Sequence, residues 1–115
     1  MEFSRLFTRQ EAEGALPLVR QIVADILRAS RRMKEVGENN LDFPRLQQEL
    51  EENLRELVDM GCYFRDWNFS VGLVDFPTII DGQTVFLCWR GDEEDLAWYH
   101  GIEDGYQGRK PLPKS

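Results

Sequence analysis

The strongest constraint on the fold is a change in the spacing of apolar residues near Gly61. Before Gly61, apolar side chains recur every three or four positions, as they do on one face of an α-helix. After it, short apolar runs alternate with turn residues, as in β-strands, and ten of the thirteen aromatic residues lie in this part. We therefore expect one α+β domain of residues 1–115, with a helical part of about residues 9–60 and a sheet and tail of about residues 61–115.

The helical part contains start and stop signals for two helices, expected over about residues 9–36 and 44–60. Thr8 and Glu11 have the spacing of a capping box, in which each side chain bonds the backbone N–H of the other residue. Gly37 and Gly61 are natural helix ends. The loop between the helices is short, so we expect the helices to pack as an antiparallel hairpin against a small antiparallel sheet.

The dipeptide Asp81-Gly82 is the strongest hairpin signal in the chain, because both central residues of a type I′ turn need a positive φ. A two-residue loop pairs Ile80 with Gln83, and this register places Asp75 opposite Cys88. Arg90 then lies diagonally across from Asp75 on the same face. The strands expected in this half are Cys62–Arg65, Val71–Phe76, Thr78–Ile80, Gln83–Arg90 and Leu96–His100.

The run Val85–Trp89 is apolar at every position, whereas a strand buried on one side alternates between apolar and polar residues. The helical hairpin can cover one face of such a strand. The other face needs the aromatic-rich tail, the first strand or a second copy of the protein. We favour the second copy, and therefore expect a homo-oligomer, a dimer in the simplest case.

Composition excludes several classes of partner. The net charge is −7, so the chain has no overall positive field for nucleic acid or an anionic membrane. No apolar run is long enough to span a membrane, and two cysteines without a CxxC pair suggest reduced thiols and a cytoplasmic location. Two cysteines and one histidine are too few for a structural zinc site of four such ligands. We therefore expect no metal and no cofactor.

The candidate site residues are the charged or polar-tipped groups within the aromatic half of the chain, where a buried charge must be compensated. His100 has Glu103 and Asp104 nearby in sequence and could act as a base, or simply form surface hydrogen bonds. Cys88 is a nucleophile only if His100 reaches it, and its apolar neighbours favour a buried, inert thiol. A structural Asp75–Arg90 ion pair is the simplest alternative to a site. The expected ligand-binding set is Asp75, Arg90, Trp98, His100 and Arg109, with no catalytic residue assigned.

Several short motifs together resemble one prokaryotic family of unknown function, domain-of-unknown-function family 2203. These motifs are Gly72–Pro77, Leu87–Arg90, Trp98–His100, Glu103–Arg109 and, in the first half, Phe7-Thr8 with Glu11-Ala12 and Leu16-Pro17. The resemblance covers nearly the whole chain. Tyr99 departs slightly from the family pattern, in which the aromatic residue directly before the histidine is most often Trp. The resemblance implies no activity, ligand or cofactor.

Two functions are consistent with these observations. The first is a non-enzymatic interaction module that forms a homo-oligomer, favoured by the doubly apolar strand and by the lack of a complete catalytic constellation. The alternative is a small-molecule-binding protein or enzyme whose polar pocket lies on the sheet. The ligand of such a pocket is unknown. Two polar residues favour this alternative, because Arg90 and His100 each stand at the end of an apolar strand.

Overall fold

The computed structural model describes residues 2–113. Its first half is a hairpin of two antiparallel helices, α1 (Arg9–Val36) and α2 (Phe43–Met60), so the predicted helical part is confirmed. The expected capping box starts α1: the Glu11 backbone N–H donates to Thr8 Oγ1 at 3.0 Å, and the Thr8 N–H donates to Glu11 Oε1 at 2.8 Å. Gly37 and Gly61 follow the helices at φ of 80° and 90°, conformations that favour glycine.

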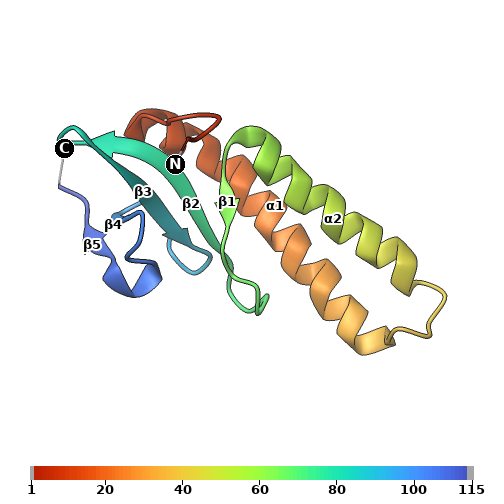
Figure 1. Ribbon diagram of the computed structural model, residues 1–115. Coiled ribbons are helices and arrows are strands. Elements are labelled where there is room, and N and C mark those ends of the chain that lie inside the picture. The colour runs from red at the N-terminus through yellow and green to blue at the C-terminus, as the bar shows by residue number, and fades with distance from the viewer. Residues whose placement is uncertain (1, 114–115) are drawn as a thin grey trace.

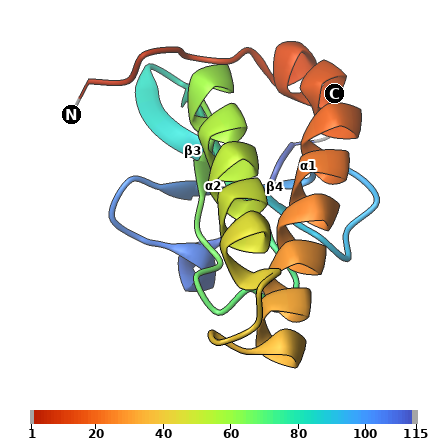
Figure 2. The same ribbon diagram turned by 90° about the vertical axis from the view of Figure 1, so that its right-hand side faces the viewer.

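The second half is a five-stranded antiparallel sheet whose strands lie side by side in chain order. Figure 1 shows the sheet at one end of the molecule and the helical hairpin projecting past it. Figure 2 shows the two helices side by side in front of the sheet. The α+β prediction is therefore confirmed. The strands are β1 (Tyr63–Phe64), β2 (Leu73–Ile80), β3 (Gln83–Arg90), β4 (Trp98–Gly101) and β5 (Lys110–Pro111).

The β2–β3 hairpin has the predicted register. Asp81 and Gly82 have φ of 50° and 78°, Ile80 pairs with Gln83, and Asp75 lies opposite Cys88. β2 continues through Pro77, although the missing N–H of proline usually disrupts a ladder. Antiparallel pairs alternate between bonded and non-bonded, and counting from the turn places Pro77 in a non-bonded pair. Its nitrogen thus faces away from β3, and no bond within this hairpin is lost.

One face of the sheet packs on α1 and forms the core. Successive strand residues point to opposite faces, so this face takes every second residue of β2 and β3. The buried side chains that pack here include Val74 and Phe76 of β2, Leu87 and Trp89 of β3, and Val19, Val23 and Ile26 of α1.

The other face of β3 is also covered within a single chain, which removes the reason given for a second copy. Every residue of Val85–Trp89 is buried. The ring of Phe86 packs edge-on against Phe3 at 5.4 Å and Tyr63 at 5.9 Å between ring centres. The N-terminal segment and β1 therefore cover this face, and oligomeric state stays a prediction without that support.

The strand limits differ from expectation in β2 and at the two ends of the sheet. The expected strands Val71–Phe76 and Thr78–Ile80 form one strand, β2, which begins at Leu73. β1 is shorter than Cys62–Arg65, and β4 begins at Trp98 rather than Leu96, because Leu96 enters the core from the preceding turn. The tail adds a 3₁₀ turn, η1 (Tyr106–Gly108), and β5, neither of which was expected. Over residues 2–113, no helix is long and apolar enough to cross a membrane.

Candidate functional site

Three polar side chains meet on the sheet face that points away from the helices. Asp75 of β2, Cys88 of β3 and His100 of β4 are each at most 3% exposed. His100 Nε2 lies 3.0 Å from Asp75 Oδ1. A ring nitrogen of His100, a carboxylate oxygen of Asp75 and Cys88 Sγ all lie within 4.8 Å of one another. Each residue thus offers one atom of a type that ligates metals.

Arg65 provides the cation beside this cluster. Its Nε donates to Asp75 Oδ2 at 3.2 Å, and its side chain is 44% exposed. The guanidinium carbon lies 5.1 Å from the ring centre of Tyr63 and 5.3 Å from that of Phe86. Arg65 therefore reaches from the solvent side over aromatic rings to the buried carboxylate.

A tight turn fixes the backbone just after Arg65. Asp66 Oδ2 accepts backbone N–H groups from Ser70 at 2.8 Å, Val71 at 2.9 Å and Gly72 at 2.8 Å. Burial acts to raise the pKa of Asp66, but these hydrogen bonds outweigh it and hold the pKa below its usual value. The Arg65 N–H in turn donates to Leu73 O at 2.8 Å, so the turn sets where the guanidinium starts.

The hydrogen bonds of His100 favour its charged form. Nδ1 faces the carbonyl oxygen of Gly101 at 2.8 Å, and Nε2 faces the carboxylate of Asp75 at 3.0 Å. Both neighbours are acceptors, so an imidazolium that donates from both nitrogens satisfies them. Burial acts to lower the pKa of His100, but the hydrogen bond and negative charge of Asp75 outweigh it, and the pKa is raised.

Cys88 is held as a thiol. Burial raises its pKa to about 12, and the negative charge of Asp75 adds to the effect. A thiol is a weak nucleophile compared with a thiolate. The interpretation of Cys88 as an inert thiol, rather than as a nucleophile activated by His100, therefore agrees with its surroundings.

A pocket of about 450 Å³ opens above the three side chains. Its floor is polar and its walls are largely apolar, which is the usual make-up of a small-ligand site. One wall comes from the segment after β4, including Ile102 and Tyr106, and the other from the strands. The remaining lining residues are Arg65, Leu73, Asp75, Phe86, Cys88, His100, Glu103 and Gly105.

The other predicted site residues form a separate cluster around Glu93. Arg109 Nη2 contacts both carboxylate oxygens of Glu93, at 2.6 and 2.7 Å. The Arg109 guanidinium carbon lies 4.7 Å from the ring centre of Trp98 and 4.9 Å from that of Tyr106. Arg90 Nη1 donates to the Tyr106 hydroxyl at 2.7 Å. This cluster ties the tail to the sheet and thereby supports one wall of the pocket.

The Asp75–Arg90 ion pair considered from the sequence does not form in the structure. Arg90 lies opposite Leu73, at the last pair of the β2–β3 ladder, and its Nε lies 3.1 Å from Asp92 Oδ1 in the following turn. Asp75 instead pairs with Arg65 and His100. Of the predicted set, the structure therefore places Asp75 and His100 in the pocket, and Arg90, Trp98 and Arg109 in the neighbouring cluster.

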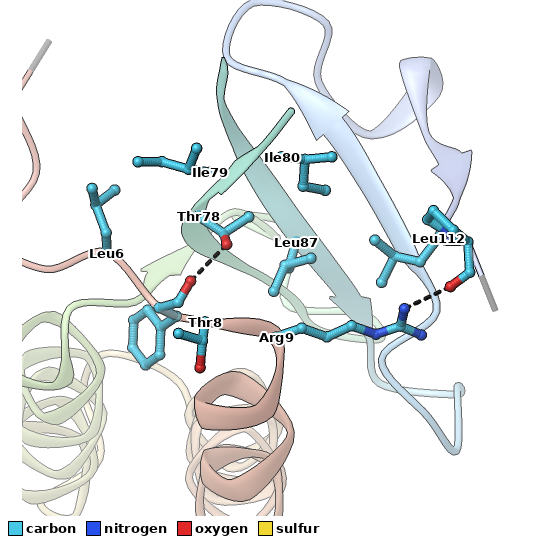
Figure 3. A pocket seen from close by; sticks show the side chains of 10 residues that line it. Leu6, Thr8, Arg9, Thr78, Ile79, Ile80, Leu87 and Leu112 are labelled. Carbon is cyan, nitrogen blue, oxygen red and sulfur yellow. Dashed lines mark hydrogen bonds between the residues drawn. The ribbon is translucent and has the colours of Figure 1, made fainter. Parts of the chain in front are cut away.

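A second cavity, of about 440 Å³, lies at the seam between the N-terminal segment, β2 and the end of the chain. Figure 3 shows its apolar lining and two hydrogen bonds across it. The Thr78 hydroxyl donates to Phe7 O, and Arg9 Nη1 donates to Pro113 O, each at 2.6 Å. These polar groups already hold the seam together, so the first pocket is the better candidate site.

Sequence reasoning omitted two members of the candidate site. Cys88 was placed opposite Asp75 by the register but left out of the set because of its apolar neighbours. Arg65 was missed because no turn signal sets the pairing of β1 with β2, in which Tyr63 lies opposite Asp75. An arginine next to an aromatic pair at the start of the aromatic half was the available signal.

Comparison with known proteins gives one match. No curated protein and no solved structure matches the chain. The sequence model of a family described as "Uncharacterized conserved protein (DUF2203)" matches residues 5–112, which include both helices and all five strands. This agrees with the resemblance seen in the short motifs. The chain therefore belongs to the uncharacterized conserved family DUF2203.

Proposed function

We propose that the protein binds a small molecule in the pocket above Asp75, Cys88 and His100. The observation that carries this proposal is the convergence of three buried polar side chains under an opening of about 450 Å³. A buried charged pair contributes little net stability compared with well-packed apolar residues, so the fold itself gives no reason for one here. A raised histidine pKa inside a cleft is typical of functional sites.

The proposed activity is binding rather than acyl transfer, because Cys88 stays a thiol at neutral pH. Arg65 bonds Asp75 through Nε and offers the other N–H groups of its guanidinium to the polar end of a ligand. Phe86, Ile102 and Tyr106 offer apolar contact to the rest of it. The free, buried thiols Cys62 and Cys88 support a cytoplasmic location.

A thermal-melt screen of anionic, neutral and cationic metabolites tests this proposal. A ligand at one hundred times its dissociation constant adds about 2.7 kcal/mol, which raises the melting temperature by several degrees. Ile102→Trp fills the pocket from its wall and should abolish the shift. Leu6→Trp, at the other cavity, is the matched control and should preserve it. Hits that respond equally to both substitutions, or a screen without hits, would refute the proposal.

Self-association as an interaction module is the second candidate. It is supported by the apolar cavity of Figure 3, beside which Leu6 and Ile79 are 45% and 54% exposed. A second copy packed there would cover both side chains. Sedimentation at micromolar concentration should then give a dimer that Ile79→Asp converts to monomer. A monomer in the unmodified protein would exclude this candidate.

A further inference from the structure

We propose that Asp75, Cys88 and His100 bind one transition-metal ion, of the zinc class, with a free coordination position facing the pocket. This inference rests on the proposed function, because it makes the same pocket the place where an outside ligand meets the ion. The expectation of no metal counted only cysteine and histidine as ligands, and therefore did not include Asp75 or a site with three protein ligands.

The spacing of the donor atoms suits such an ion. In a tetrahedral zinc site, bonds of about 2.0–2.3 Å place neighbouring donors about 3.3–3.7 Å apart. Here Nε2 of His100 and Oδ1 of Asp75 are 3.0 Å apart, and Cys88 Sγ lies within 4.8 Å of a ring nitrogen of His100 and of a carboxylate oxygen of Asp75. These separations bracket the required spacing, and all three side chains are buried on adjacent strands that hold their backbones in register.

The groups around the donors already hold them in the orientation of metal ligands. A ligating histidine usually donates its other ring N–H to a carbonyl or carboxylate, which leaves one nitrogen for the metal. Gly101 O takes Nδ1 of His100 at 2.8 Å, so Nε2 is the nitrogen left over. Arg65 takes Oδ2 of Asp75 at 3.2 Å, so Oδ1 is the oxygen left over. These two atoms bond each other at 3.0 Å, so an ion bound between them replaces this hydrogen bond, and His100 loses the proton on Nε2.

The donor types select the class of ion. A bound ion displaces the protons of Cys88 and His100, which leaves one thiolate, one imidazole and one carboxylate as donors. This set suits zinc and related first-row metals, whereas calcium and magnesium prefer oxygen donors alone. Three protein ligands leave a position open, as in catalytic zinc sites, whereas structural sites use four. The pocket lies directly over the three side chains, so a small molecule with a carboxylate, hydroxamate or thiol group can complete the coordination.

Cobalt(II) titration of the full chain, after treatment with a chelator, tests this inference. Binding through Cys88 should produce a sulfur-to-cobalt charge-transfer band that saturates at one ion per chain. Zinc should abolish the band by displacing cobalt. Cys88→Ser should remove the band and weaken binding by more than about 100-fold, since loss of an outer-shell partner alone costs about 10–100-fold. Cys62→Ser, which alters the other buried thiol outside the pocket, should leave both unchanged.

Two further variants keep the test decisive if Cys88→Ser fails to fold. Asp75→Asn and His100→Gln should each weaken cobalt binding by at least about 100-fold, the upper limit for loss of an outer-shell partner, while circular dichroism remains native. Equal cobalt affinity in these variants and in the unmodified chain would show adventitious surface binding and overturn the inference. The proposed function has a separate readout. Ligands whose thermal shift is lost in Ile102→Trp but unaffected by chelator would support the small-molecule pocket and overturn the metal site.

Discussion

The turn held by Asp66 offers the sharpest test of how the site is positioned. Asp66→Asn keeps the size of the side chain but removes its negative charge. In the folded protein, one carboxylate oxygen accepts three backbone N–H groups at 2.8–2.9 Å and the Ser70 hydroxyl at 3.3 Å. The amide oxygen of asparagine can take the same place, but only as a neutral acceptor.

The expected loss follows from the number of these bonds. A hydrogen bond to a charged group contributes roughly 1.5–3 kcal/mol and a neutral one roughly 0.5–1.5, a difference of about 1 kcal/mol for each bond. The Gly72 N–H is buried, whereas those of Ser70 and Val71 are partly buried, so water recovers part of the loss. We expect Asp66→Asn to lower the free energy of unfolding by about 2–3 kcal/mol.

Urea denaturation at neutral pH measures this loss, with Asp59→Asn as the control. Asp59 is an exposed residue of α2, so its substitution removes the same charge and should change stability by less than about 0.5 kcal/mol. Equal effects of the two substitutions would refute the assignment of Asp66 as the organiser of the turn.

The same substitution has a defined pH dependence. The folded-state pKa of Asp66 lies below its ordinary value of 3.8, so the carboxylate stabilises the fold above that pH. This contribution is lost as the pH falls through the lower folded-state pKa. The difference in stability between Asp66→Asn and the unmodified chain should therefore be full above about pH 5 and shrink below pH 4. A difference that grows in acid would contradict the reasoning.

Four further substitutions, each measured by urea denaturation, test the fold and the cluster. Gly91→Ala should cost several kcal/mol or prevent folding, because the new Cβ would lie 1.9 Å from Val71 O. Gly14→Ala should instead stabilise α1 by about 1 kcal/mol, because its new Cβ meets open space. Thr8→Ala removes the capping box and should cost about 1 kcal/mol; no loss would mean that the cap is not formed in solution. Asp75→Ala, measured with chelator present, should lower the free energy of unfolding by about 1–3 kcal/mol. This is less than the loss from breaking a fully buried ion pair, because the buried imidazole can lose its proton. A loss above 5 kcal/mol would mark Asp75 as structural.

The helices and the central hairpin were predictable because local signals determine them. Thr8 and Glu11 start α1, glycines end both helices, and Asp81-Gly82 sets the register that brings Asp75 opposite Cys88. Once a two-residue turn is assigned, every pair along the two strands follows from the side-chain period of two.

The partners of Asp75 were less predictable because they depend on contacts between residues that lie far apart in the sequence. Arg65 comes from β1, whose pairing depends on the Asp66 turn rather than on a tight hairpin. Arg90 shares a face with Asp75, but it ends its strand beside Asp92 and Tyr106 and pairs there. Asp75 was not considered as a metal ligand because only cysteine and histidine were counted. Zinc sites with three protein ligands and an open position accept Asp as well.

The alternation of side chains along β2 and β3 separates two kinds of constraint within single strands. Val74, Phe76 and Leu87 pack on the helices, whereas their immediate neighbours Asp75 and Cys88 face the pocket. Mutational tolerance should therefore follow a parity rule, with folding failures at one set of alternate positions and changed ligand preference at the other. For protein engineering, the sheet is then a scaffold whose pocket can be rewritten residue by residue while the interface with the helical hairpin stays as it is.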